Sequence, residues 1–244
     1  MDHDAITKIV AVNGYGVGVT PNPFALQQKE WERRKKYAVI RKALTDKIVS
    51  LFEPRFITPP ETSECIESIV TMSDSRKVLE LGTHTGFTAL HILRALVGKE
   101  GALLVSVDCR PAHDTTFFST PELKPIFRHI PDWTPKCLQQ LYGTMFDLVF
   151  VDSDHTAEHT NNEMVELWKI TQHGSIFLFH DVPEWRQPTD HNPAPVRKWL
   201  FEHSRPDVMR GCILPTCEQL DCLDVWGAGY PKQCNPHQGV FVRS

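Results

Sequence analysis

The stretch Val78-Leu-Glu-Leu-Gly-Thr-His-Thr-Gly-Phe-Thr-Ala-Leu90 predicts a buried strand, a tight turn and a helix, in that order. Gly82 and Gly86 allow the backbone to bend sharply and to approach a ligand closely, because glycine has no Cβ. The helix that begins after Gly86 directs its first amide groups at the same place. Glu80, near the end of the strand, can bind a polar or cationic group. We therefore expect a ligand site where this strand ends.

The spacing of the glycines disfavours a dinucleotide ligand. A nicotinamide dinucleotide site needs the pattern G-x-G-x-x-G, in which the backbone closely approaches a diphosphate. Counted from Gly82, the second and third glycine positions are occupied by His84 and Phe87. A second anchor is Asp108, at the end of the next predicted strand, where a carboxylate can accept hydrogen bonds from both hydroxyls of a ribose. The expected ligand is a nucleoside with a polar tail and no diphosphate.

Short apolar runs alternate with helical patterns along the rest of the chain, which indicates a parallel sheet with crossover helices. The predicted strands are 77–81, 103–107, 146–151 and 175–179, with an antiparallel edge pair at 223–226 and 239–242. The predicted helices are 26–52, 86–97, 133–142, 156–170 and 194–203. A hairpin or mobile arm is expected over 5–20, around Asn13-Gly14. We expect an N-terminal arm and helix over 1–56 and one α/β domain over 57–244.

The composition fits a globular chain that can bury a sizeable core without disulfides or metal. The chain has 244 residues, of which 41 % are hydrophobic and 23 % are charged. No apolar run approaches the ~20 residues that span a bilayer. A net charge of −4 at pH 7 gives no general attraction to nucleic acid or to an anionic membrane. We therefore expect neither as a partner.

The seven cysteines predict reduced thiols. Near the C-terminus they follow the pattern C-x4-C-x4-C-x11-C-x2-H, which lacks the paired C-x2-C knuckles of structural zinc sites. Cys65, Cys109 and Cys137 lie in core-like segments and are interpreted as small buried hydrophobes. The first residues, Met1-Asp2-His3-Asp4, are acidic where a secretory signal would be basic. These features predict a cytoplasmic protein.

The motifs together resemble those of class I S-adenosylmethionine-dependent methyltransferases. The pattern E-x-G-x-x-x-G-[FY]-[ST] over residues 80–88, with an acid ending the second strand, is similar to that of small-molecule O-methyltransferases of the catechol O-methyltransferase type. It is also similar to the related bacterial group of macrolide-sugar and cephalosporin-pathway enzymes. The resemblance covers residues 57–243. It implies a Rossmann-like α/β fold with a doubly wound, mostly parallel seven-stranded sheet, and S-adenosylmethionine as the cofactor.

The resemblance also implies which residues hold the cofactor. In similar enzymes an acid after the third strand binds the adenine amino group and a neighbouring side chain covers the ring. Asp132 and Trp133 fit these roles at the end of the segment 127–133. The complete set of implied cofactor-binding residues is Glu80, Gly82, Thr83, His84, Gly86, Phe87, Thr88, Asp108, Asp132, Trp133 and Asp152.

Polar side chains end two later strands, where open α/β sheets place their ligands. Asp152 follows the strand 146–151, and His180-Asp181 follow the strand 175–179. The resemblance places these strands side by side and implies that Asp152, His180 and Asp181 hold a divalent cation, which orients the substrate hydroxyl and lowers its pKa. His180 stands where the family has a carboxylate. Mg²⁺ prefers oxygen ligands, whereas Mn²⁺, Fe²⁺ or Zn²⁺ tolerates imidazole, so metal binding stays an open alternative.

Catalysis is assigned to His155 and Asp152. A neutral imidazole can take a hydroxyl proton near neutral pH, which makes His155 the candidate general base. The alternative is that His155 only caps the following helix or orients Asp152. His159, four residues further along on the same face of the predicted helix, is interpreted as a surface residue, with support of the site as the alternative.

The expected function is transfer of a methyl group from S-adenosylmethionine to a hydroxyl of a small-molecule acceptor. Two alternatives remain: a protein that binds the cofactor without transfer, and an N-methyltransferase. An NAD-dependent oxidoreductase is disfavoured by His84 and Phe87. A nucleic-acid methyltransferase is disfavoured because Asp152-Ser-Asp-His155 stands where an N/D-P-P-[YF] tetrapeptide would be expected. The segments 1–56 and 183–196 are expected to frame the acceptor pocket, and a homo-oligomer is left open.

Overall fold

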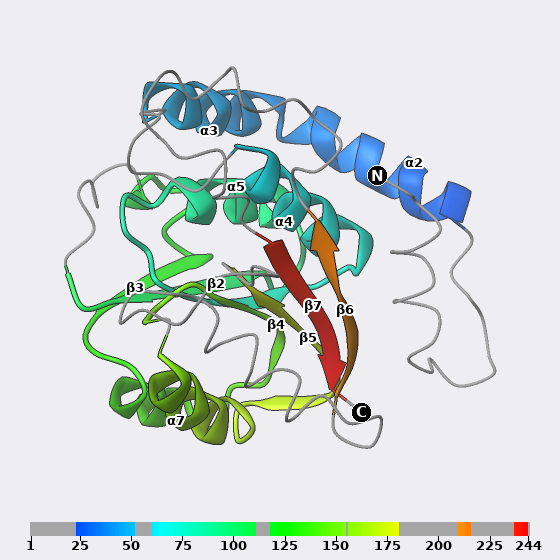
Figure 1. Ribbon diagram of the computed structural model, residues 1–244. Coiled ribbons are helices and arrows are strands. Elements are labelled where there is room, and N and C mark those ends of the chain that lie inside the picture. The colour runs from blue at the N-terminus through cyan, green and yellow to red at the C-terminus, as the bar shows by residue number, and fades with distance from the viewer. Residues whose placement is uncertain are drawn as a thin grey trace, which may run out of the picture.

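A seven-stranded sheet forms the centre of the computed structural model, which describes residues 23–51, 60–110, 118–154, 156–180, 209–215 and 237–243. The strands are β1 (Lys77–Leu81), β2 (Leu103–Asp108), β3 (Phe127–Pro131), β4 (Phe146–Val151), β5 (Thr171–Phe179), β6 (Met209–Pro215) and β7 (His237–Arg243). Their order across the sheet is β3-β2-β1-β4-β5-β7-β6 (Figure 1). Strands β1 to β5 are parallel, and β7 pairs antiparallel with both β5 and β6.

This order is doubly wound, because the chain places β2 and β3 on one side of β1 and β4 and β5 on the other. The predicted α/β fold with a mostly parallel seven-stranded sheet is confirmed. The edge strand that pairs with β7 is β6, which the sequence did not predict. The expected strand 223–226, the arm 5–20 and the helix 194–203 lie outside the described residues.

Helices cover both faces of the sheet. They are α2 (Pro23–Lys36), α3 (Ala38–Ser50), α4 (Pro60–Met72), α5 (Phe87–Leu96), the 3-10 helix η1 (Lys136–Leu141) and α7 (Ala157–Leu167). Helices α3, α4 and α5 lie over one face and α7 under the other (Figure 1). Among the helices of the described ranges, none combines the length and apolar character that a bilayer crossing requires.

Strand alternation sends neighbouring side chains to opposite layers of the core. Val78 and Leu104 pack with the helices α3, α4 and α5, whereas Leu79 and Val105 pack with α7 and η1. Four of the five β1 residues are buried because helices cover both faces of the sheet. The polar edge that remains available for function is the one where the parallel strands end.

Two predicted helices differ from the observed ones. The helix expected over 26–52 is broken at Tyr37, whose backbone has φ −105° and ψ 24°. A Cβ at Gly98 would lie 2.2 Å from the Tyr37 ring, so the ring occupies the space beside that glycine, a packing contact that sequence periodicity does not reveal. The helix expected over 133–142 is the shorter 3-10 helix over Lys136–Leu141.

A buried ionic cluster joins three of the helices. Glu67 of α4 accepts hydrogen bonds from His91 Nδ1 at 3.1 Å and from Arg94 Nε at 2.8 Å, both on α5. Arg41 of α3 lies 3.3 Å from the same carboxylate. Burial raises the pKa of Glu67, but the hydrogen bonds from His91 and Arg94 outweigh burial and hold the pKa at about 2.

Replacing Glu67 with alanine should lower the free energy of unfolding by about 3–5 kcal/mol, because it leaves buried cations without their counter-charge. Urea denaturation at neutral pH measures this change. Since the folded pKa is below the ordinary value of 4.5, the contribution is present above pH 4.5 and is lost as the pH falls toward about 2.

Glu64→Ala is the matched control, because Glu64 lies on the same helix and is exposed. It should change the unfolding free energy by no more than about 0.5 kcal/mol. Equal effects of the two variants would contradict the assignment of stability to the buried cluster.

Candidate active site

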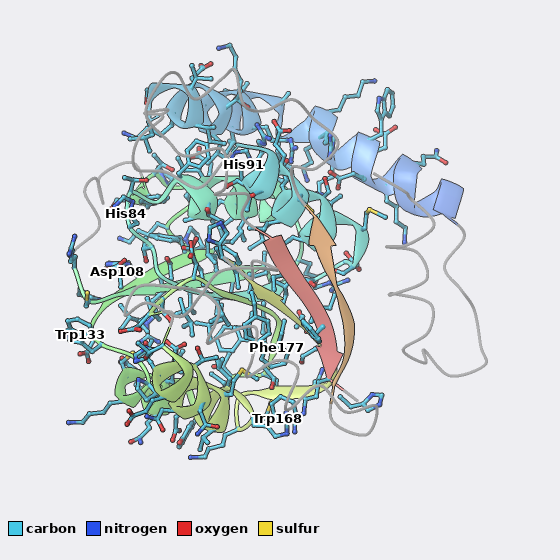
Figure 2. The ribbon with its side chains drawn as sticks, viewed as in Figure 1. His84, His91, Asp108, Trp133, Trp168 and Phe177 are labelled. Atoms are coloured by element: carbon cyan, nitrogen blue, oxygen red, sulfur yellow. The ribbon has the colours of Figure 1, made fainter. Side chains whose placement is uncertain are left out.

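A cleft of about 350 Å³ opens where strands β1 to β4 end. Four aspartates contribute to its lining, which comes from the ends of these four strands, the loops that follow them and the first turn of α7. The lining residues are Gly82, His84, Val107, Asp108, Cys109, Arg110, Asp132, Trp133, Thr134, Asp152, Ser153, Asp154 and His159. Figure 2 shows His84, Asp108 and Trp133 along one edge of the molecule, at the ends of the strands.

The turn after β1 is held against both neighbouring strands. The Gly82 amide donates to the Val107 carbonyl of β2 at 2.8 Å, and the Asp152 amide after β4 donates to the Leu81 carbonyl at 2.8 Å. Gly82 has φ +95°, and a Cβ there would lie 2.0 Å from the Asp152 carbonyl oxygen. The backbone can therefore pass between β2 and β4 only without a side chain. Gly86, with φ +83°, is the N-cap of α5.

Asp108 joins the first two loops of the cleft. One carboxylate oxygen accepts the His84 amide at 2.8 Å, and the other accepts the Arg110 amide at 2.8 Å. These bonds orient the carboxylate while each oxygen keeps capacity for a further donor. His84, at φ +46°, turns its backbone toward Asp108. The predicted position for a ribose-binding acid is thus a fixed, charged group on the cleft wall.

Glu80 lies beneath the turn and is fully buried. The Ser106 hydroxyl donates to one carboxyl oxygen, and the other oxygen has no hydrogen-bond partner among the described residues. Burial raises the pKa of Glu80 to about 8; the Ser106 hydrogen bond opposes the rise and the charges of Asp152 and Asp108 add to it. At neutral pH this group is mostly a neutral acid that supports the turn from below.

Several other predicted cofactor residues do not line the cleft. Thr83 Oγ1 is 2.6 Å from the Ser106 hydroxyl, and Thr88 Oγ1 is 3.2 Å from the Ser63 hydroxyl. Phe87 is buried in the core. Together with Gly86 they shape the turn and the start of α5. Their structural role is packing and hydrogen bonding within the protein.

The loop after β3 supplies the opposite end of the cleft. Asp132 accepts the Trp133 amide at 2.8 Å. The Trp133 side chain is 66 % exposed, which leaves a large aromatic face available to a flat ligand group. Both residues line the cleft, at the positions that the sequence assigned to the adenine end.

The structure brings Asp152 and His180 together at the ends of β4 and β5. His180 Nδ1 lies 3.0 Å from Asp152 Oδ1, and the two side chains are only 8 % and 19 % exposed. The other predicted residues of this half, His155 and Asp181, lie outside the described residues. Within the described ranges, no group of three His, Cys, Asp or Glu side chains could hold a metal ion.

Two residues interpreted from sequence as unimportant to the site lie in the cleft. Cys109 was expected to be buried but is exposed on the cleft wall, since it follows the last residue of β2. His159 was expected on the surface but lines the cleft, and its Nε2 is 2.9 Å from Glu163 Oε1. The signal that could have revealed this pair is the i, i+4 spacing of His159 and Glu163 on one helix.

The segment that carries the cleft is similar in sequence to known proteins. Residues 79–182 match the family model described as a methyltransferase domain. Catechol O-methyltransferase B of Danio rerio is 28 % identical over 126 residues, which are 48 % of this chain and 46 % of that protein. The chain therefore spans about half the length of the curated relative that it matches.

Solved structures share the fold at low sequence identity. An O-methyltransferase from Bacillus cereus, solved in complex with SAH, is 15 % identical with a TM-score of 0.61, and the match covers 98 % of this chain and 100 % of that one. The O-methyltransferase TomG from Streptomyces achromogenes, solved in complex with SAM, is 13 % identical with a TM-score of 0.58, covering 100 % of both chains.

Gly82→Ala should lower the free energy of unfolding by at least about 3 kcal/mol, because it combines a left-handed backbone with a clash against the Asp152 carbonyl. Thermal or urea unfolding measures the loss. Gly174→Ala is the matched control, since Gly174 has φ +87° but open space around a Cβ. It should cost only about 1–2 kcal/mol. If both variants lose the same amount, the close approach of β1 and β4 is not the constraint at Gly82.

Proposed function

Because residues 79–182 match the family model of a methyltransferase domain, we propose that the chain transfers a methyl group from S-adenosylmethionine to a hydroxyl of a small molecule. The observation that carries the proposal is the acidic cleft inside this segment, at the edge where parallel α/β sheets bind ligands. It unites the glycine turn at Gly82 with the oriented carboxylate of Asp108. The O-methyltransferases that share the fold include proteins solved with SAH and with SAM.

In this proposal the cofactor lies along the cleft from β4 to β3. Asp108 accepts hydrogen bonds from the ribose hydroxyls with the oxygen lone pairs that the backbone amides leave free. Asp132 accepts from the adenine amino group, and Trp133 covers the ring. The turn at Gly82 meets the methionine part. The positive sulfonium is also attracted by the carboxylates that line the cleft.

The protein's main task in such a transfer is alignment. The sulfonium donor is already activated, so the acceptor oxygen attacks the methyl carbon in line as the carbon–sulfur bond breaks. S-adenosylhomocysteine leaves as a neutral thioether. The acceptor hydroxyl must give up its proton, which a side chain takes.

We propose that His155 takes that proton and that Asp152 is the second catalytic residue. His155 comes three residues after Asp152, whose backbone and side chain are held by Leu81 and His180. A neutral imidazole accepts a proton efficiently near neutral pH. The acceptor is therefore expected to enter next to the ends of β4 and β5.

A divalent cation is a separate proposal for the same place. Asp152 and His180 already pair with each other, and no further His, Cys, Asp or Glu completes a group of three with them among the described residues. A cation would need Asp181 as a third ligand. The imidazole of His180 would favour Mn²⁺, Fe²⁺ or Zn²⁺ over Mg²⁺.

Asp108→Ala should weaken S-adenosylhomocysteine binding by at least about a hundredfold, because two charge-assisted hydrogen bonds are lost. Isothermal titration calorimetry measures the affinity. Asp147→Ala is the matched control: Asp147 also accepts two backbone amides, from Arg76 and Lys77 at 2.9 Å each, but at the opposite end of β1. Undiminished affinity in Asp108→Ala would remove Asp108 from the site.

His155→Ala should slow methyl transfer by roughly 10²–10⁴-fold while S-adenosylhomocysteine affinity stays unchanged, since only the proton acceptor is lost. The assay uses S-adenosylmethionine labelled in its methyl group, with catechol as the first acceptor. His173→Ala is the matched control: it changes an exposed histidine of β5 and should leave the rate unaltered.

Chelation separates the two ways of removing the proton. If a chelator stops the wild-type reaction and Mn²⁺ restores it, while His155→Ala keeps its rate, then a cation and not His155 lowers the pKa of the hydroxyl. Binding of the cofactor without any transfer to a broad panel of hydroxyl acceptors would instead favour the non-transferring alternative.

A further inference from the structure

Glu163 is a fully buried carboxyl group beside the cleft, and three elements converge on it. Its Oε1 accepts the Ser153 hydroxyl, from the loop after β4, at 2.7 Å. It also accepts the Thr134 hydroxyl, from the loop after β3. His159 Nε2, one helical turn earlier on α7, lies 2.9 Å from the same oxygen. The carboxyl group is thus held in one orientation by the two loops and its own helix.

These contacts define which nitrogen of His159 carries a proton. Both neighbours of Nε2 act as acceptors, because Glu163 Oε1 already accepts the hydroxyls of Ser153 and Thr134, and Thr134 gives its own proton to Glu163. Nε2 is therefore a donor. The other ring nitrogen, Nδ1, has no partner among the described residues. The imidazole lines the cleft with 18 % of its side chain exposed, and Nε2 is already occupied by Glu163 and Thr134, which leaves Nδ1 for a ligand.

The charges around the imidazole favour its protonated form. The hydrogen bond to Glu163 raises the pKa of His159, partial burial opposes the rise, and the charges of Glu163 and Asp154 add to it. In the protonated ring Nδ1 is also a donor. The charged or titratable side chains that share the cleft are His84, Asp108, Cys109, Arg110, Asp132, Asp152 and Asp154.

His159 belongs to the end of the cleft formed by the loop after β3. Its Nε2 is 2.9 Å from Thr134 Oγ1, the residue next to Trp133. If the proposed function holds, the sulfonium lies near Asp152 and the ribose lies near Asp108. The adenine ring then lies beside Trp133, the large exposed aromatic side chain of the cleft. That position is within the part of the cleft that His159 lines.

We propose that His159, held by Glu163, recognises the purine of the cofactor by donating a hydrogen bond from Nδ1 to a ring nitrogen. This inference rests on the proposed function and deepens it. Asp132 accepts from the exocyclic amino group while His159 donates to a ring nitrogen. An amino donor beside a ring-nitrogen acceptor is the pattern that adenine displays on its edge. Glu163 is a positioning residue, since it acts only through His159.

The proposal links cofactor binding to a proton. Because the ligand binds the imidazolium, binding raises the pKa of His159 further and takes up a proton from solvent when the free imidazole is partly neutral. Affinity is therefore highest below the pKa of His159 and falls as the pH rises through it. The proton binds at Nδ1 and is released again when the ligand leaves.

The test is calorimetric titration of S-adenosylhomocysteine into the full chain, in phosphate and in Tris, whose ionisation enthalpies differ. Wild-type protein should take up protons near neutral pH and bind more weakly as the pH rises. His159→Gln should lose this uptake and bind roughly tenfold more weakly at about pH 6, the loss of a hydrogen bond to a charged group, with a smaller difference at about pH 9. Glu163→Gln should lower the pH at which proton uptake occurs.

His173→Gln is the matched control, since it removes an exposed imidazole from β5 and should keep both affinity and uptake. Thermal unfolding checks that each variant is folded. If the wild-type protein binds S-adenosylhomocysteine but takes up no proton, the inference is overturned by that measurement alone. Unchanged uptake in folded His159→Gln also overturns it and leaves the proposed function standing. If wild-type protein does not bind S-adenosylhomocysteine at all, the proposed function and the inference both fail.

Discussion

The close approach of β1 to its two neighbours at Gly82 is the constraint on which the cleft depends. The Gly82 amide is bonded to β2, and the Asp152 carbonyl oxygen would lie 2.0 Å from any Cβ at this position. The chain then turns through residues with positive φ into α5. Because the turn lies between β2 and β4, the loops after these two strands line the same cleft. Asp108 and Asp152 are brought to one cleft by this packing.

The pKa values of two buried carboxyl groups, one between the helices and one under the cleft, depend on the number and charge of their hydrogen-bond donors. Glu67 meets two arginines and a histidine, and its pKa falls to about 2. Glu80 receives one neutral hydroxyl and faces the charges of Asp152 and Asp108, and its pKa rises to about 8. The same side chain is therefore an ion that joins helices in one place and a neutral support under a turn in the other.

Much of the fold could be predicted because its signals are local. The β1 and β4 ranges agree with the predicted 77–81 and 146–151, since continuous apolar runs between turn residues are typical of strands in a parallel sheet. The break at Tyr37 could not be predicted, because it accompanies the packing of the Tyr37 ring against Gly98. Likewise, the pairing of β6 with β7 is a long-range contact that the sequence of β6 does not predict.

The candidate site shows the same division between local and long-range causes. Residue type and spacing along the chain determined the glycine turn at Gly82, the acid Asp108 and the polar strand ends, because each belongs to a strand followed directly by a loop. Only the tertiary structure decided that Glu80 lies buried under the cleft and that His159 lines it. The physical reason is that exposure and pairing depend on elements far apart in sequence: His159 meets Thr134 only because the loop after β3 packs against the first turn of α7.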